Sequence, residues 1–251
     1  MKEETLKHIW KQEASKTIEG WDFSYLDGRW EMEPLPWNYE AIVNAHLKQT
    51  DRLLDMGTGD GNVLLQFMHA PKLTAVTEGY PVNYELCKRK LKPLGIRVEF
   101  VAADDVLPFD DESFDIIINR QESFRLDEVK RVLKSGGIFI TQQVGYRNSR
   151  VLAKRLGCAY ESVNLTYALA YQCEMAQSLG FNVLEADEKD AWIKFYDVGA
   201  VAYYAHIIEW EFENFNVERS FEGLLELQKE LDVKGYVLSN EHRYLMVIQK
   251  P

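Results

Sequence analysis

The sequence predicts an α/β fold in which helices cover both faces of a parallel sheet. Between residues 52 and 144, short apolar runs alternate with segments of helical period. The run FDIII at 114–118 is typical of a strand that is buried on both faces. A glycine-rich turn joins the first apolar run to the helical segment that follows it. Strands that alternate with helices in this way form parallel sheets.

Each strand is expected where an apolar run is bounded by turn residues, and each helix where apolar residues recur with a period near 3.6. The expected strands are 52–56, 73–77, 97–102, 114–118, 138–144, 181–186 and 242–249. The expected helices are 39–47, 63–69, 82–91, 126–133, 167–179, 198–208 and 221–231. Gly136-Gly137 and Gly180 precede the fifth and sixth strands as chain breaks.

The chain is expected to form a single domain over residues 1–251, since no repeat or linker divides it. An N-terminal arm, 1–50, holds four of the six tryptophans and is too aromatic for a solvated tail. Residues 51–145 carry the regular alternation of strands and helices. Residues 146–251 supply the rest of the sheet, with a helical insertion at about 198–232.

Charge and cysteine content narrow the class of partner. The chain has 29 basic and 40 acidic residues and a net charge of −11. This balance argues against a nucleic-acid partner, because such affinity comes mainly from Lys and Arg neutralising phosphates. Cys87, Cys158 and Cys173 form no Cys-x-x-Cys pair or Cys/His cluster, so no metal site is expected. The charged start and the lack of an apolar run of about 20 residues predict a cytoplasmic protein without a membrane segment.

The turn after the first strand, LLDMGTGDGN at 53–62, carries the strongest functional signal. Its glycines let the backbone approach a ligand closely, and N–H groups at a helix start can bind a polar group. The dinucleotide fingerprint fails at its sixth position, which is Asn62, and the P-loop Gly-Lys-Ser/Thr is missing. Asp55 would be unfavourable beside a pyrophosphate but useful beside an ammonium group. The turn therefore argues against both a nicotinamide dinucleotide and a nucleoside triphosphate.

Glu78 ends the second expected strand, 23 positions after Asp55. An acid at that distance beyond the glycines can accept hydrogen bonds from both hydroxyls of a ribose. Taken alone, Glu78 would be interpreted as a solvated acid at a strand end. Its combination with the glycine turn favours the ribose.

Together with later segments, these features form a pattern that resembles the class I S-adenosylmethionine-dependent methyltransferases. The chain shows DMGTGDG, Glu78, the acids Asp104 and Asp105, LPFDDESFD and RVLKSGGIFI in the order in which that family carries them. The resemblance covers about residues 50–145. It implies a Rossmann-like, seven-stranded, mostly parallel sheet whose last strand is antiparallel and inserted beside the fifth. It also makes residues 51–145 the cofactor-binding core.

The resemblance implies a role for each matching position. The glycine backbone should border the methionine part of S-adenosyl-L-methionine, with Asp55 near its amino group and Glu78 on its ribose. Asp104, with Asp105 beside it, should contact the adenine. The implied cofactor-binding residues are Asp55, Gly57, Thr58, Gly59, Gly61, Glu78, Gly79, Asp104, Asp105 and Asn119.

Candidates near the methyl acceptor follow the fourth and fifth strands, because open α/β sheets bind ligands at the carboxyl ends of their strands. Glu122 could act as a base for an acceptor that must lose a proton, or it could cap the next helix. Aromatic side chains of the arm and the insertion are either a lid over a planar or apolar acceptor or ordinary core residues. The catalytic candidates are Glu122, Asn119 and Gln143, and the substrate candidates are Trp37, Gln121, Tyr203 and Tyr204.

We expect methyl transfer to a small molecule. One alternative is an RNA or protein methyltransferase, which would need a basic or grooved acceptor face. Another is a nonenzymatic S-adenosylmethionine-binding protein, because cofactor residues alone do not prove transfer. No oligomeric state is predicted.

Overall fold

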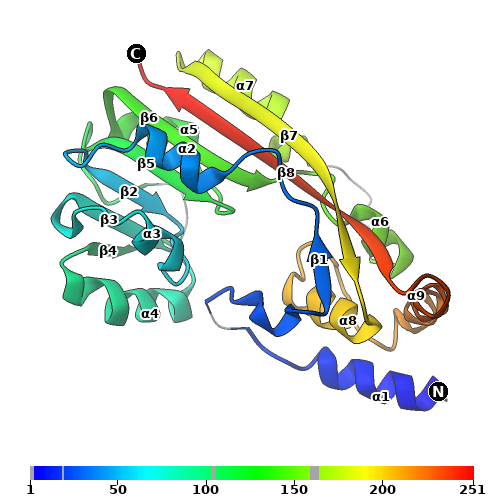
Figure 1. Cartoon of the computed structure of the whole chain (residues 1–251). Helices are drawn as coiled ribbons and strands as arrows, with labels where there is room; N and C mark the ends of the chain where they lie inside the picture. The colour runs from blue at the N-terminus through cyan, green and yellow to red at the C-terminus, as the bar shows by residue number, and fades with distance from the viewer. Residues whose placement is uncertain (1–2, 19, 103–105, 159–163) are drawn as a thin grey trace.

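The computed structural model describes residues 3–18, 20–102, 106–158 and 164–251, and the strands among them form one sheet in the order β1-β7-β8-β6-β5-β2-β3-β4 (Figure 1). The strands are β1 (Trp30–Met32), β2 (Leu53–Met56), β3 (Thr74–Glu78), β4 (Arg97–Phe100), β5 (Phe114–Arg120), β6 (Leu133–Val144), β7 (Asn182–Phe195) and β8 (Val237–Gln249). The helices are α1 (Glu3–Glu13), α2 (Tyr39–His46), α3 (Asn62–Gln66), α4 (Pro81–Leu91), α5 (Leu126–Val132), α6 (Arg150–Arg155), α7 (Leu169–Ser178), α8 (Val198–Ile207) and α9 (Phe221–Lys234). None of the described helices is both long and apolar enough to cross a membrane.

Strands β2 to β6 form the parallel part of the sheet. β2 pairs with β3 on one side and β5 on the other, and all four of its residues are buried. A strand in that position needs apolar side chains on both faces, which explains the continuous apolar runs. One hydrophobic cluster packs this sheet against α5 and α7, and another packs it against α2, α3 and α4. The expected Rossmann-like α/β architecture, with helices on both faces, is therefore confirmed.

The other end of the sheet is antiparallel. β8 lies between β6 and β7 and runs antiparallel to both, so the expected antiparallel last strand beside the fifth predicted strand is confirmed. The expected count of seven strands is wrong, because β1 of the N-terminal arm adds an eighth. β1 pairs with the end of β7, from Ile193 to Phe195. β7 pairs with β8 along one edge only, so its other edge is open to β1.

Several expected elements are longer in the structure than the sequence predicted. β7 was expected to end at residue 186 but continues to Phe195, and β8 begins at Val237 rather than at 242. The added part of β7, DEKDAWIKF, begins with charged residues that lack an apolar alternation. Its pairing with β8 holds it as a strand. β6 also begins earlier than expected, at Leu133, with Gly136 in a left-handed conformation at φ 77°.

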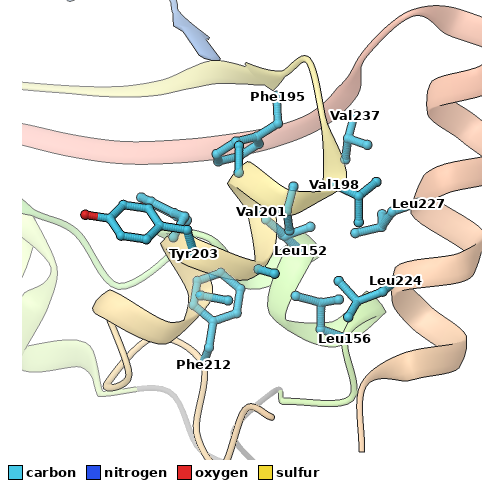
Figure 2. Packing of buried hydrophobic residues seen from close by; sticks show 14 of the residues in the cluster. Leu152, Leu156, Phe195, Val198, Val201, Tyr203, Phe212, Leu224, Leu227 and Val237 are labelled. Carbon is cyan, nitrogen blue, oxygen red and sulfur yellow. The ribbon is translucent and has the colours of Figure 1, made fainter. Parts of the chain in front are cut away.

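A second hydrophobic core lies at the far end of the β7–β8 ribbon (Figure 1). Helix α8 is its centre, since eight of its ten residues are buried and its sequence VGAVAYYAHI is apolar on every side. Side chains of α6, α9 and the two long strands pack around it (Figure 2). The late insertion therefore builds a core of its own.

The N-terminal arm is an integral part of this second core. Trp10 of α1 and Leu26 of the 3-10 helix η1 (Phe23–Leu26) are buried in it. Arg29 ties the arm to α8: its Nη2 lies 2.6 Å from Oδ1 of Asp197, the N-terminal capping residue of α8, and its Nη1 lies 3.1 Å from Glu13. The expectation that the arm packs on the rest of the chain is confirmed.

Replacement of Leu26 by alanine tests this packing. Leu26 is fully buried, so Leu26→Ala should lower the free energy of unfolding by about 2–5 kcal/mol in urea denaturation. Leu165→Ala, at an exposed position, serves as the control and should change it by no more than about 0.5 kcal/mol. Equal stability of the two variants would show that the arm is dispensable for folding.

Candidate active site

The glycine turn connects β2 to α3 and packs tightly against its neighbours. The backbone N–H groups of Gly57 and Thr58 both donate to the carbonyl of Thr77 in β3, at 3.0 and 3.1 Å. Gly57 has φ 68°, and a β-carbon on it would lie 2.3 Å from Cβ and Cγ of Glu122. Gly57 must therefore be glycine, and the Glu122 side chain lies directly over the turn.

Asp55 is the buried acid beneath this turn. Burial raises the pKa of its carboxyl to about 7; the nearby Thr58 hydroxyl and the positive charge of Arg120 oppose the shift, and the negative charge of Glu78 adds to it. A cation bound above the turn would favour the ionised form. The site is thus electrostatically suited to a positively charged ligand.

Glu78 is also buried, at the end of β3, and both of its carboxylate oxygens accept backbone N–H groups. Oε2 accepts from Gly59 and Oε1 from Tyr80, each at 2.8 Å. Burial raises the pKa of this carboxyl, and those two hydrogen bonds oppose the rise. Each oxygen has a second lone pair, so the carboxylate can still accept two ligand hydroxyls. A β-carbon on the next residue, Gly79, would lie 2.6 Å from the carbonyl of Val101, which keeps this connection close-packed.

Asn83 is a buried polar residue of α4 that the sequence reasoning did not single out. Its side chain is 1% exposed, and neither amide atom has a hydrogen-bond partner among the described residues. Asn83 lies one helical turn before Cys87, whose Sγ donates to the carbonyl of Gly59 at 2.9 Å. The spacing of Asn83, Cys87 and Leu91 along the buried side of α4 was the available signal. An unpaired buried amide costs free energy, and a polar ligand at the turn would relieve that cost.

The tips of β5 and β6 bring together three of the predicted residues. Asn119 is fully buried, and its Oδ1 accepts from Thr141 Oγ1 at 2.9 Å and from Gln143 Nε2. The same nitrogen of Gln143 donates to the backbone carbonyl of Glu122 at 2.9 Å. Asn119 and Gln143 therefore hold the segment that carries Glu122.

The remaining acceptor-side residues lie around this network. Gln121 is exposed, has φ 60°, and donates its N–H to the carbonyl of Gln142 at 2.9 Å. The Gln142 side chain accepts from Trp37 Nε1 at 2.8 Å, on the opposite face of β6 from Gln143. Trp37 thus closes the face of the sheet that α2 covers.

Tyr203 and Tyr204 lie in the second core. Tyr204 is surrounded by the rings of Phe23, Trp30, Phe195 and Phe212. Tyr203 stacks edge-on against Tyr25 with ring centroids 4.9 Å apart, and its hydroxyl points away from the cluster (Figure 2). The structure therefore favours the core interpretation over the lid for Tyr204.

The structure does not test the predicted adenine contact. Asp104 and Asp105, which were expected to make it, lie outside the described residues. Across the described ranges, no group of three or more His, Cys, Asp or Glu side chains is arranged to hold a metal ion.

Comparison with known proteins agrees with this geometry. A family model described as a methyltransferase domain matches residues 54–141, which include the glycine turn, Glu78 and Asn119. The chain carries a class I S-adenosylmethionine-dependent methyltransferase domain. The matched segment corresponds to the part of the chain that the sequence analysis assigned to the cofactor.

Curated relatives match this methyltransferase domain over part of their length. Demethylmenaquinone methyltransferase of Thermus thermophilus is 33% identical over 114 residues, which cover 41% of this chain and 51% of the relative. Phthiotriol/phenolphthiotriol dimycocerosates methyltransferase of Mycobacterium tuberculosis is 35% identical over 99 residues, 35% of this chain and 36% of the relative. The chain therefore matches about half, or less, of these proteins.

Solved structures show that the fold extends beyond the matched segment. A candidate methyltransferase from Bacillus halodurans superposes with a TM-score of 0.58 at 19% identity, over 84% of this chain and 97% of the other. The YcgJ protein of Bacillus subtilis gives a TM-score of 0.57 at 18% identity, over the same shares of the two chains. At these identities the likeness concerns the fold alone.

The raised pKa of Asp55 predicts a pH-dependent cost to stability. An unfolded aspartate ionises near pH 4, whereas the folded one keeps its proton until about pH 7. As pH rises between these values the unfolded state loses its proton first, so the folded state becomes progressively less favoured. Asp55→Asn carries no charge at any pH. Its stability advantage over the wild type should be near zero at pH 4 and reach the order of 2–4 kcal/mol above pH 7.

Urea denaturation at pH 4.5 and pH 8 measures this difference. The control is Asp110→Asn, at an exposed position. A stability difference for Asp55→Asn that is the same at both pH values would contradict the assigned pKa.

Proposed function

We propose that this chain transfers a methyl group from S-adenosyl-L-methionine to a small, planar or apolar acceptor bound between the tips of β5 and β6. One observation carries the proposal: Glu122 lies directly over Gly57 and is held there by Gln143 and Asn119. This places a carboxylate and an amide at the junction between the cofactor turn and the two strand tips that remain open to an acceptor.

The residues of the turn fit the cofactor. The Glu78 carboxylate would accept the ribose hydroxyls, and Asp55 would face the ammonium group of the methionine part. The unpaired amide of Asn83, one helical turn before the Cys87 contact with Gly59, would offer a donor and an acceptor to a ligand at the turn. When bound, the cofactor supplies an electrophilic methyl group on a cationic sulfur, which the buried acids stabilise electrostatically.

The acceptor-side residues would orient the nucleophile. Methyl transfer is an in-line displacement, so alignment of the attacking atom with the methyl group supplies much of the rate. Glu122 would accept a proton from an acceptor that must lose one. Gln143 and Asn119 act as positioning residues, because they fix the backbone and side chains on which that alignment depends.

The two relatives are named for demethylmenaquinone and for dimycocerosates, which are lipid-like acceptors. The net charge of −11 favours an acceptor of that kind over RNA. We accordingly assign the acceptor to small apolar or planar molecules, over RNA or protein, and the activity to an enzyme rather than to a cofactor-binding protein.

Glu78→Gln tests the cofactor half of the proposal. The variant keeps the side-chain volume but loses the charge that strengthens hydrogen bonds to the ribose. Affinity for S-adenosylmethionine, measured by calorimetry, should fall by about 1–3 kcal/mol. Glu85→Gln on the exposed side of α4 is the matched control and should bind as the wild type does. Normal binding by Glu78→Gln would show that Glu78 only anchors the turn.

Transfer of label tests the acceptor half. The chain is incubated with methyl-tritiated S-adenosylmethionine and a cell extract, and the product is separated into organic-soluble, RNA and protein fractions. We expect label in the organic-soluble fraction, with a rate that falls about 100-fold in Glu122→Gln if the acceptor loses a proton to Glu122. Glu174→Gln, on α7, should transfer at the wild-type rate.

Each other outcome contradicts a part of the proposal. Label in RNA or protein would overturn the acceptor class. Cofactor binding without label in any fraction would make the chain a binding protein.

A further inference from the structure

The N-terminal arm reaches the glycine turn at one point, the pair Gly20-Trp21. A β-carbon on Gly20 would lie 3.1 Å from Cβ of Asp60, in the turn. The indole Cδ1 of Trp21 is 3.9 Å from the place that a β-carbon on Gly59 would occupy. The arm therefore contacts the turn at Gly59 and Asp60, and α4 contacts it through the hydrogen bond of Cys87 to the Gly59 carbonyl.

Three aromatic rings from distant parts of the chain meet at this point. The centroid of Trp21 lies 5.6 Å from that of Trp210, edge to face, and 6.2 Å from that of Tyr80. Tyr80 follows Glu78 by two residues, and Trp210 belongs to the segment after α8. The arm, the cofactor-binding core (residues 51–145) and the late insertion therefore meet close to Glu78.

These rings are surface rings, unlike the others of the arm. Trp21, Tyr80 and Trp210 are 41%, 51% and 57% exposed. Trp10 and Tyr204, in contrast, are buried in the second core. Exposed aromatic side chains that gather in one place are typical of a ligand-binding surface.

The backbone at Trp21 is strained to hold the ring in this place. Gly20 has φ 66° and Trp21 has φ 57°, a left-handed conformation that a bulky residue rarely adopts. The residues that follow fix it: Asp22 accepts the N–H of Ser24 at 2.9 Å and begins η1, whose Leu26 is buried. Strain of this kind persists at functional sites where the surroundings determine the conformation.

We propose that Trp21 is a cofactor-binding residue supplied by the arm, and that with Tyr80 and Trp210 it forms an aromatic lid over bound S-adenosylmethionine. This inference rests on the proposed function. The ligand offers both kinds of group that exposed indole and phenol rings bind, a planar purine and a sulfonium cation. The buried acids Asp55 and Glu78, together with Asp60, against which Gly20 packs, complement that cation.

The experiment measures the affinity for S-adenosylhomocysteine by calorimetry, with intrinsic tryptophan fluorescence as a second readout. Trp21→Ala should bind about tenfold more weakly, and Trp21→Phe, which keeps a ring, within about threefold of the wild type. Tyr171→Ala is the matched control, because Tyr171 on α7 is 39% exposed, close to the exposure of Trp21. It should bind as the wild type does. Ligand binding should change the emission of the wild type, and Trp21→Phe should lose most of that change.

The outcomes separate the lid from the proposed function. Failure of the wild type to bind either S-adenosylmethionine or S-adenosylhomocysteine would overturn the proposed function itself. Normal binding by the wild type and by Trp21→Ala alike, with an unaltered fluorescence response in Trp21→Phe, would overturn the lid alone. Thermal unfolding of each variant without ligand distinguishes loss of binding from loss of fold; a Trp21→Ala variant that fails to fold leaves Trp21→Phe and its fluorescence response as the deciding measurement.

Discussion

The antiparallel pairing of β7 with β8 is the interaction on which the rest of the structure depends. The two strands pair along nearly their whole length, whereas β6 supports β8 only from Arg243 to Gln249. The rest of the ribbon projects past the parallel strands and is stabilised by α8, α9 and the arm (Figure 1). One ribbon therefore joins the cofactor half to the second core. The arm reaches the glycine turn because this ribbon fixes where the second core lies.

Two buried carboxyl groups lie close together in the cofactor-binding core, and their ionisation costs free energy. Asp55 and Glu78 are both buried, burial raises the pKa of each carboxyl, and the negative charge of Glu78 raises that of Asp55 further. The Glu78 carboxylate accepts two backbone N–H groups, whereas the ionised form of Asp55 is favoured only by the nearby Thr58 hydroxyl and the charge of Arg120. An apolar residue in place of Asp55 would fold more readily. A bound cation would stabilise the ionised form of Asp55, so the free energy that burial of this acid costs in the unbound protein would be offset when the ligand binds.

Local sequence was sufficient to predict the parallel strands and the glycine turn. Continuous apolar runs such as FDIII have few other stable environments, and the glycines of the turn meet backbone angles and close contacts that other residues cannot. Local sequence was not sufficient for β1 or the second half of β7. β1 has three residues, and β7 carries exposed acids there, so partners far along the chain decide that both are strands. The family pattern named Glu78, but Asn83 emerged only when its burial and its unpaired amide were known.

For the aromatic residues outside the parallel sheet, the sequence does not predict which ones are buried in a core and which ones are exposed to a ligand. A tryptophan or tyrosine gains free energy from burial in a core and from contact with a ligand alike, so composition does not distinguish the two. Tyr204 and Trp21 are both aromatic residues outside the parallel sheet, yet Tyr204 is enclosed by four rings and Trp21 lies on the surface. What separates them is a backbone feature, the consecutive left-handed residues Gly20 and Trp21 that turn the second ring outward over the cofactor site. A chain optimised only for folding would avoid such a conformation at tryptophan, and its presence beside the glycine turn is best explained by the ligand that the ring would cover.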